Sequence, residues 1–567
     1  MTAKNELGYK NKMRKKSIFL FFLICSLLVI SFCSNTVEAQ EELRPIIIRA
    51  DGSIEGTDKI QRIGNIYFLI GNIEFTESSG PFLAAITIQK DQITLDGRGF
   101  KLQNFGNYVG AGIDLAERYN VTVKNFQIIG FSNGINFNKD SNELKDSSEN
   151  TVINNTLTAP SFNRFNVGIW VAGSTNNKVI NNEITGYNQF GIYVYFSNYT
   201  YLSGNVVTDN NVGISLDFRC ENTILRSNHM FDNEKNFEIN YFYPSGFIQD
   251  IDTSNTVNSK PIYYWLNQHN KTVPSDAGFV ALVNCSGITV QNLNIENNEN
   301  GITLYSTNNS VIKDNNLYNC GNAIEIRSCH NLTVSGDAIY NSSHSGVRIS
   351  KSSYIQITEN YIESSSFGIT LSGYNNDHTG YGGSNNVSIL LNNFTGNNPG
   401  IDITFSTDNV ISGNSFVDNQ LCIRAVATTS NLIVGNNFTE NSGPAIYLSE
   451  ARNNTFYHNN FINNSAEGTQ ISWYGESGGQ NIWDNGYEGN FWSNQNITDN
   501  DGNGINDNPY IINSNNQDNY PITKPINIES VVIPEFPSSI IQLIFLFIIL
   551  FAVIKNRLFH QRSKNDQ

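Results

Sequence analysis

The sequence predicts an all-β protein, namely a right-handed parallel β-helix solenoid with coils of about 22 residues. The first observation behind this prediction is a Gly-Ile pair, or a close variant of it, that recurs along the chain, as at Gly301-Ile302, Ala323-Ile324 and Gly346-Val347. Successive copies lie 22 or 23 residues apart. A fixed period of this length is typical of proteins built from stacked repeats.

The second observation is the internal pattern of each repeat. Apolar and polar residues alternate in Ile324-Glu325-Ile326, which is typical of a strand with one buried face. A second strand has the form Asn-x-Val/Ile, as in Asn177-Lys178-Val179-Ile180, and a third follows, as in Asn182-Glu183-Ile184. Three short strands with three corners per repeat make one coil of a parallel β-helix.

The third observation is the residue types that separate the strands, which are mostly Asn and Gly. Both residues tolerate the left-handed backbone conformation that tight corners need. Because Asn recurs at one place in successive coils, we expect its side chains to stack as an amide ladder. Helical patterns are nearly absent between the two ends of the chain.

The two ends of the chain carry features of targeting segments. Basic residues precede an apolar run from Ile18 to Phe32 and a small residue at Ala39, so residues 1–39 are predicted to be a secretory signal peptide, with an uncleaved anchor as the alternative. Residues 538–554 form an apolar run at the short end of a membrane span, and the basic tail 555–567 is expected to stay cytoplasmic. The sequence therefore predicts an exported protein held at the cell surface by its C-terminus.

The region between these ends divides by regularity. We expect an N-terminal cap with the first coils at residues 40–110, followed by the regular repeats at 111–470, which contain one aromatic, irregular interruption at 240–277. A C-terminal cap with an acidic loop is expected at 471–525, and a linker at 526–537. Caps are expected because the terminal coils of a solenoid expose unpaired strand edges.

Charge and cysteine content exclude two classes of protein. The chain carries a formal net charge of −16, which repels phosphate backbones, so nucleic acid is not an expected partner. The five cysteines beyond the signal peptide are odd in number and widely spaced, which does not fit a disulfide framework. Only a Cys320–Cys329 pair remains open.

The acidic loop of the C-terminal cap is the strongest candidate for a metal site. The loop matches the first nine positions of an EF-hand-type calcium loop. Its candidate ligands stand at alternate positions and are the side chains of Asp499, Asp501, Asn503 and Asp507 and the backbone carbonyl of Ile505, and Gly504 allows the turn. Tyr510 stands where the bidentate Glu belongs, and no helical pattern flanks the loop. The alternative is a solvated acidic turn.

One column of outward residues follows the Gly-Ile positions from coil to coil. Opposite charges alternate at Glu325/Arg348 and at Asp402/Arg424, which favours a stacked ion-pair ladder over an acid–base couple. Earlier in the same column, Trp170 precedes Tyr193, and two flat rings make a candidate sugar-stacking platform. The alternative is that these two rings only cover each other. No column shows two facing carboxylates, which argues against a polysaccharide-cleaving enzyme.

Several segments resemble the NosD-like β-helix family, whose founding members are called periplasmic copper-binding proteins. The resemblance rests on Asp250–Trp265, Asp276–Cys285, Gly489–Ser493 and Asp499–Tyr510, and it spans most of residues 45–525. It implies copper as a cofactor, for which the adjacent pair His229-Met230 supplies the candidate ligands. The wider superfamily is described as carbohydrate-binding and sugar-hydrolysing. Pro534-Glu535-Phe536 resembles an archaeal C-terminal sorting signal.

These observations leave three hypotheses for the function. The first is a membrane-anchored surface module that binds polysaccharides or envelope proteins, or has a structural role. The second is a copper-handling protein of the NosD type. The third is a polysaccharide lyase or glycoside hydrolase, which would need two or more carboxylates facing one groove.

Overall fold

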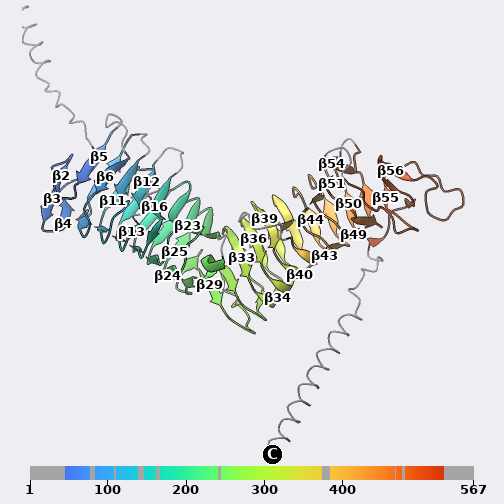
Figure 1. Ribbon diagram of the computed structural model, residues 1–567, viewed down its shortest axis with the longest axis horizontal. Helices are drawn as coiled ribbons and strands as arrows, with labels where there is room; N and C mark the ends of the chain where they lie inside the picture. Colours follow the sequence, from blue (N-terminus) through green and yellow to red (C-terminus); the bar gives the residue numbers. More distant parts are fainter. Residues whose placement is uncertain are drawn as a thin grey trace, which may run out of the picture.

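The computed structural model describes residues 45–76, 83–106, 110–137, 146–160, 166–240, 244–372, 383–465, 468–474 and 479–528. Within these ranges the chain forms a right-handed parallel β-helix of about 16 turns, as predicted (Figure 1). None of its described segments is a helix able to cross a membrane, and the short 3-10 helix η2 (Pro244–Phe247) is a single turn. The predicted signal peptide (1–39) and membrane anchor (538–554) lie outside the described residues.

The solenoid has two arms, and each arm is built from three stacks of parallel strands. In the first arm, the first stack contains β1 (Ile46–Ile48), β6 (Ala84–Ile88), β9 (Ala111–Asp114), β12 (Asn133–Asn136), β16 (Val167–Ala172), β20 (Phe190–Tyr195), β23 (Val212–Asp217) and β26 (Lys235–Asn240). The second contains β4 (Ile66–Leu69), β7 (Thr94–Asp96), β10 (Thr122–Lys124), β14 (Thr151–Ile153), β18 (Lys178–Ile180), β21 (Tyr201–Ser203), β24 (Ile224–Arg226) and β27 (Asp250–Ile251). The third contains β5 (Ile73–Phe75), β8 (Lys101–Asn104), β11 (Gln127–Ile129), β15 (Thr156–Thr158), β19 (Glu183–Thr185), β22 (Val206–Thr208), β25 (His229–Phe231) and β28 (Thr256–Val257).

The second arm repeats this plan. Its first stack contains β29 (Lys260–Leu266), β30 (Phe279–Val283), β33 (Asn300–Tyr305), β36 (Asn322–Arg327), β39 (Ser345–Ser350), β42 (Phe367–Ser372), β45 (Ile401–Thr404), β48 (Ile423–Val426), β51 (Ile446–Ser449) and β54 (Ile471–Tyr474). The second contains β31 (Thr289–Gln291), β34 (Asn308–Lys313), β37 (His330–Ser335), β40 (Ser353–Thr358), β43 (Asn385–Leu390), β46 (Val410–Ser412), β49 (Leu432–Val434) and β52 (Thr455–Tyr457). The third contains β32 (Asn294–Glu296), β35 (Asn316–Tyr318), β38 (Ala338–Tyr340), β41 (Tyr361–Glu363), β44 (Asn393–Thr395), β47 (Ser415–Val417), β50 (Asn437–Thr439), β53 (Asn460–Ile462) and β55 (Phe491–Trp492).

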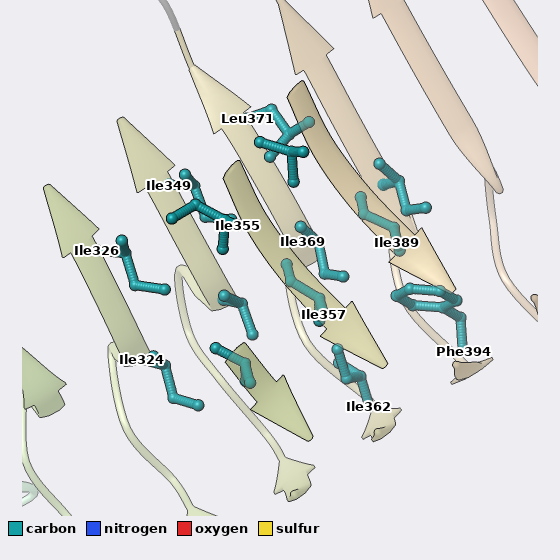
Figure 2. Packing of buried hydrophobic residues seen from close by; sticks show 14 of the residues in the cluster. Ile324, Ile326, Ile349, Ile355, Ile357, Ile362, Ile369, Leu371, Ile389 and Phe394 are labelled. Atoms are coloured by element: carbon teal, nitrogen blue, oxygen red, sulfur yellow. The ribbon is translucent and has the colours of Figure 1, made fainter. Parts of the chain in front are cut away.

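The hydrophobic core runs inside the coils as stacked ladders of equivalent side chains. Ile326, Ile349 and Leu371 are register partners in successive strands of one stack, and all three are buried (Figure 2). Side chains of the other two stacks, among them Ile357 and Ile362, point into the same interior (Figure 2). Each fully buried Ile contributes about 1.5–3 kcal/mol, so the repeating apolar positions account for most of the stability of the rod.

The predicted asparagine ladder is present at the corners. The side-chain amide of Asn205 donates to Oδ1 of Asn228 at 2.8 Å, and Asn228 donates in turn to Oδ1 of Asn255 at 2.8 Å. Other corner residues, such as Asn181 with a φ of 51°, take the expected left-handed conformation. Each ladder residue also satisfies buried backbone groups of neighbouring coils, and the ladder continues across a longer coil, as from Asn360 to Asn392.

A bend separates the two arms (Figure 1). It coincides with the predicted interruption, where β28 pairs antiparallel with β29 and so carries the third stack of the first arm into the first stack of the second. On the opposite side, β26 joins the corner Asn297–Asn300 directly, through the N–H of Asn236 to the carbonyl of Asn297 at 2.6 Å. The outer side thus holds two more strands, β29 and β30, than the inner side, a difference of about 10 Å at ordinary strand spacing. This difference produces the bend.

Both ends of the solenoid are capped. At the N-terminus, the short strand β2 (Ile54–Glu55) pairs antiparallel with β1, and β3 (Ile60–Ile63) pairs antiparallel with β4. Apart from this cap, a short parallel pair of β13 (Ser147–Ser148) and β17 (Ser174–Thr175) lies at a corner of the first arm. At the C-terminus the hairpin of β56 (Tyr510–Asn513) and β57 (Asn516–Asp518) closes the rod. The ring of Trp492 stacks between Phe461 at 4.3 Å and Tyr510 at 4.1 Å, which extends the core stack into this cap.

One position of the amide ladder holds a carboxyl group instead. Asp337 Oδ1 accepts hydrogen bonds from the backbone N–H and the side-chain amide of Asn315, both at 2.8 Å, whereas its Oδ2 has no partner among the described residues. Burial raises the pKa of Asp337 to about 7. Because its folded-state pKa lies above that of the unfolded chain, this group increasingly destabilises the fold as the pH rises from about 4 to about 7.

We predict that Asp337→Asn stabilises the protein at pH 8 by about 1–3 kcal/mol, because the amide supplies the missing donor to Asn360 and buries no charge. The measurement is the free energy of unfolding at pH 5 and pH 8, and the gain should shrink at the lower pH. The matched control Asn414→Asp should show the opposite effect. Equal stability of Asp337→Asn and the wild type at pH 8 would contradict this account.

Candidate functional site at the bend

An aromatic row runs along the outward face of the first stack toward the bend. Trp170, Tyr193, Ser215 and Glu238 are successive register partners on β16, β20, β23 and β26. The rings of Trp170 and Tyr193 lie 6.2 Å apart, and Phe190 stacks on Tyr193 at 4.2 Å. The two residues predicted as a platform are therefore neighbours, and their sugar-stacking role stays a prediction.

Sequence reasoning missed how far this row extends. Tyr195 lies 5.7 Å from Tyr193 and 5.5 Å from Phe218, and Phe218 stacks with Phe196 at 5.7 Å. Phe196 is 45% exposed, and the other rings of the row are partly exposed. Phe196 and Phe218 escaped notice because they follow their strands at the corner and do not belong to the outward column.

The row ends at two carboxyl groups of the first arm. The hydroxyl of Tyr193 donates to Oδ2 of Asp217 at 2.8 Å, and the backbone N–H of Phe218 donates to its Oδ1 at 2.7 Å. Glu238 continues the column of Tyr193 and Ser215 and is partly exposed. Asp217 and Glu238 therefore lie on the same outward face of neighbouring strands.

The second arm adds two groups to this face of the bend. The backbone N–H of Glu299 donates to the carbonyl of Phe237, which places the Glu299 side chain beside β26. His344 Nδ1 lies 2.7 Å from Oε1 of Glu299. We name the group of Tyr193, Asp217, Glu238, Glu299 and His344 the elbow cluster.

The pKa values of the elbow cluster reflect burial and crowding of carboxyl groups. Burial, together with the nearby charges of Glu299 and Asp217, raises the pKa of Glu238 to about 7. Burial also raises the pKa of Asp217, although the hydrogen bonds from Tyr193 and Phe218 act in the opposite direction. The hydrogen bond to Glu299 raises the pKa of His344. The cluster therefore holds one carboxyl group, that of Glu238, whose pKa lies near neutral pH, which is the range in which a side chain can transfer a proton efficiently.

This convergence differs from the sequence-based expectation that carboxylates do not face one another. Asp217 stands two residues beyond the outward column, and Glu299 comes from a coil after the interruption. Counting repeats places Asp217 opposite Asn240 and therefore diagonal to Glu238, although Asp217 was overlooked because it lies outside the column. Glu299 could not be aligned with Glu238 in this way, because the bend decides which corner of the second arm meets β26.

Further along the outward column, oppositely charged residues of successive coils are register partners. The guanidinium of Arg424 pairs with Asp402 at 2.8 Å, as the ladder prediction required. Glu325 and Arg348 are register partners, and Oε2 of Glu325 accepts a hydrogen bond from the amide of Asn300 at 2.9 Å. All five described cysteines are buried and free, so Cys320 and Cys329 do not form the pair that remained open.

The acidic loop of the C-terminal cap is held by its own side chains. Oδ1 of Asp499 accepts hydrogen bonds from the N–H groups of Gly502 and Asn503, and Asp501 accepts two from Asn503. The loop borders a cavity of 750 Å³ that His458 and Glu488 also line. Within the described ranges, no three His, Cys, Asp or Glu side chains are placed to hold a metal ion together. Calcium binding by Asp499, Asp501, Asn503, Ile505 and Asp507 stays a prediction.

This prediction can be tested by thermal unfolding with calcium or with a chelator. Calcium bound by the loop should raise the unfolding midpoint by a few degrees, because a ligand that binds only the folded state stabilises it. Asp501→Asn should abolish the shift, whereas Asp418→Asn, a change to an exposed carboxylate of the regular coils, should preserve it. A midpoint that does not respond to calcium would identify the segment as a solvated acidic turn.

The comparison with protein families decides the relationship of the chain. The family described as "Periplasmic copper-binding protein (NosD)" matches residues 84–245, 248–382 and 378–498, which is well over half of the chain. The chain belongs to the NosD family. The periplasmic description of the NosD family accords with the export predicted from residues 1–39. The search of the curated proteins gave no significant match.

Solved structures with a similar trace include enzymes and an adhesin. The structure of XylC in complex with xylose is 14% identical in sequence, with a TM-score of 0.25, and the match covers 37% of this chain and 42% of the XylC chain. The periplasmic alginate epimerase AlgG, as a mutant, is 11% identical (TM-score 0.24; 77% and 84%), and PfbA, a surface adhesin of Streptococcus pneumoniae, is 12% identical (TM-score 0.25; 64% and 84%). The match thus spans less than half of the XylC chain. Structural similarity with TM-scores this low says nothing about the activity of this protein.

The copper of the NosD description does not fit the pair singled out in the sequence. His229 is exposed and its Nδ1 lies 2.9 Å from Oγ1 of Thr256, whereas Met230 is fully buried in the core. Adjacent residues of a strand point to opposite faces, so the two side chains cannot share one ion. The other described histidines lie on separate coils, and His330 and His458 contact Ser353 and Glu488. The described residues therefore gather no ligand set for copper.

Proposed function

We propose that this NosD-family protein is an exported surface protein that binds a polysaccharide chain along the aromatic row of its first arm. The observation that carries the proposal is the continuous set of rings Trp170, Phe190, Tyr193, Tyr195 and Phe218. Flat apolar faces suit the carbon–hydrogen faces of pyranose rings, and hydrogen-bonding groups beside them suit the hydroxyl groups.

The direction of the row supports a polymer as the ligand. Trp170 and Tyr193 lie on successive strands, about 4.8 Å apart along the axis of the rod, whereas Phe190 and Tyr195 lie on the same strand as Tyr193, β20. This spacing is comparable to the length of one hexose, so consecutive sugar units can meet consecutive coils. The row leads into the carboxyl groups of Asp217 and Glu238, which can accept hydrogen bonds from sugar hydroxyls.

Rigidity also supports a binding role. The outward residues of the row stand on strands whose backbones are held by the coils on both sides, so little ordering entropy is lost when a ligand binds. The proposal keeps the C-terminal segment 538–554 as a membrane anchor, which would present the rod at the cell surface. A protein of the cell envelope is the alternative partner for the same face.

We predict that Trp170→Ala and Tyr193→Ala each weaken binding of a neutral hexasaccharide by about tenfold, since each removes a stacking surface worth about 1 kcal/mol or more. The measurement is isothermal titration calorimetry with cellohexaose, maltohexaose and chitohexaose. Tyr193→Phe should retain most of the affinity because it keeps the ring.

The matched control for this experiment is another aromatic pair of the coils. Tyr340 and Tyr361 lie 5.8 Å apart on the third stack of the second arm, away from the row. Tyr361→Ala should leave the affinity unchanged. Absence of binding to all three sugars, or equal loss in the control, would refute the proposed function.

A further inference from the structure

We propose that the elbow cluster is a catalytic site that hydrolyses glycosidic bonds of an uncharged polysaccharide, with Glu238 as the general acid and Asp217 as the general base. This inference rests on the proposed function, because the aromatic row delivers the sugar chain to the cluster. It goes further by assigning a reaction and by giving separate roles to two residues.

The surroundings of these carboxyl groups differ from those of the structural ion pairs. In the regular column, Asp402 is neutralised by Arg424 of the next coil. At the bend, the register neighbour of Glu238 is Ser215, and the neighbours of Asp217 are Tyr195 and Asn240. The sheet therefore supplies no basic partner to either carboxyl group, which is an unfavourable arrangement for a purely structural site.

A second observation points to a ligand at the bend. Oδ1 of Asn322 has no hydrogen-bond partner among the described residues, although Asn322 is only 6% exposed. The register neighbours of Asn322 are Asn300 and Ser345. The side chain of Asn300 contacts Glu325 and that of Ser345 contacts Thr370, both on the outward face. Asn322 stands between these two neighbours and therefore lies on the same outward face. Its backbone N–H bonds the carbonyl of Glu299. A sugar hydroxyl bound in the elbow would supply the donor that Asn322 lacks.

Glu238 suits the role of the acid. It stands on the last strand of the first arm, where it faces Asp217 from its own sheet and Glu299 and His344 from the second arm. These are the titratable and charged groups that act on it, and burial with the two carboxylates keeps its proton up to about neutral pH. A carboxyl that stays protonated there can transfer its proton to the oxygen of a departing sugar.

Asp217 suits the role of the base. The hydroxyl of Tyr193 and the N–H of Phe218 orient its carboxylate beside the ring on which a sugar would stack. Glu299 is less suited, because its carboxylate is held by His344 and packs against Gly321, where even a Cβ atom would collide with it. Tyr193, Glu299 and His344 are therefore positioning residues.

The reaction consumes one water molecule. Glu238 gives its proton to the glycosidic oxygen as the bond from that oxygen to the anomeric carbon breaks. Asp217 takes a proton from the water whose oxygen forms the new bond to the same carbon. Asp217 and Glu238 are diagonal neighbours on adjacent strands, with Cα atoms about 8 Å apart. Direct attack of this water on the face of the sugar opposite the departing oxygen inverts the anomeric configuration.

The charge of the site selects the substrate class. Asp217, Glu299 and Glu325 lie around the bend, and the whole chain carries a net charge of −16. Polymers of uronic acids or sulfated sugars would meet this negative field and be repelled. Neutral hexose polymers would not be repelled, and their apolar faces match the aromatic row.

The test measures binding and cleavage separately, on the full chain purified in detergent. The probes are cellohexaose, maltohexaose and chitohexaose, with polygalacturonate as the charged comparison. We expect the wild type to cleave at least one neutral hexasaccharide, with activity that declines above about pH 7 as Glu238 loses its proton. Glu238→Gln and Asp217→Asn should each lower the cleavage rate by about 100-fold or more. Glu183→Gln, on an exposed carboxylate of another face, is the matched control and should have no effect.

The outcomes distinguish this inference from the function on which it rests. Cleavage with inversion by the wild type, and retained binding without cleavage by Glu238→Gln, would support it. Binding without cleavage by the wild type would overturn the catalytic role and leave the binding function intact. Equal cleavage by the wild type and Glu238→Gln would overturn the assignment of the acid. Neither binding nor cleavage by the wild type would overturn both proposals. Unchanged thermal unfolding of each variant would show that a lost activity is not a lost fold.

Discussion

The structure depends on hydrogen bonds between successive coils that stay in register. Most strands bond the strand 22 or 23 residues away, and the corner asparagines bond their equivalents in the same way, as Asn205 bonds Asn228. These bonds satisfy buried polar groups, so each coil must return to the same place after the same rise. The length of the repeat, the apolar ladders and the choice of Asn at the corners all follow from this constraint.

The bend between the two arms is the place where this constraint is relaxed, and it brings carboxyl groups of both arms together. Where β28 turns antiparallel into β29, the rod gains strands on one side only, and the two arms meet at an angle. The inner side of that angle joins the last strand of the first arm to a corner of the second. Carboxyl groups that a straight rod would keep apart, such as Glu238 and Glu299, therefore come to share one environment.

Family membership and surface chemistry carry different information about this protein. The NosD relationship covers most of the coils and accounts for the fold. The copper of the family description finds no matching set of ligands among the described residues, since Met230 is buried in the core and His229 is exposed on the opposite face of its strand. The aromatic row and the elbow cluster instead offer stacking surfaces, hydrogen-bond acceptors and a transferable proton, which together suit a carbohydrate.

The sequence by itself determined the solenoid, its period, the interruption, the asparagine ladder and the neighbouring positions of Trp170 and Tyr193. These features are periodic or local, so residue spacing is enough to predict them. It also showed that Asp402 and Arg424 would pair. Only the tertiary structure decided that Glu299 and His344 of the second arm meet Asp217 and Glu238 of the first, because their proximity depends on the direction in which the chain leaves an irregular segment. A repeat predicts contacts within its own period, and the bend is the place where that period fails.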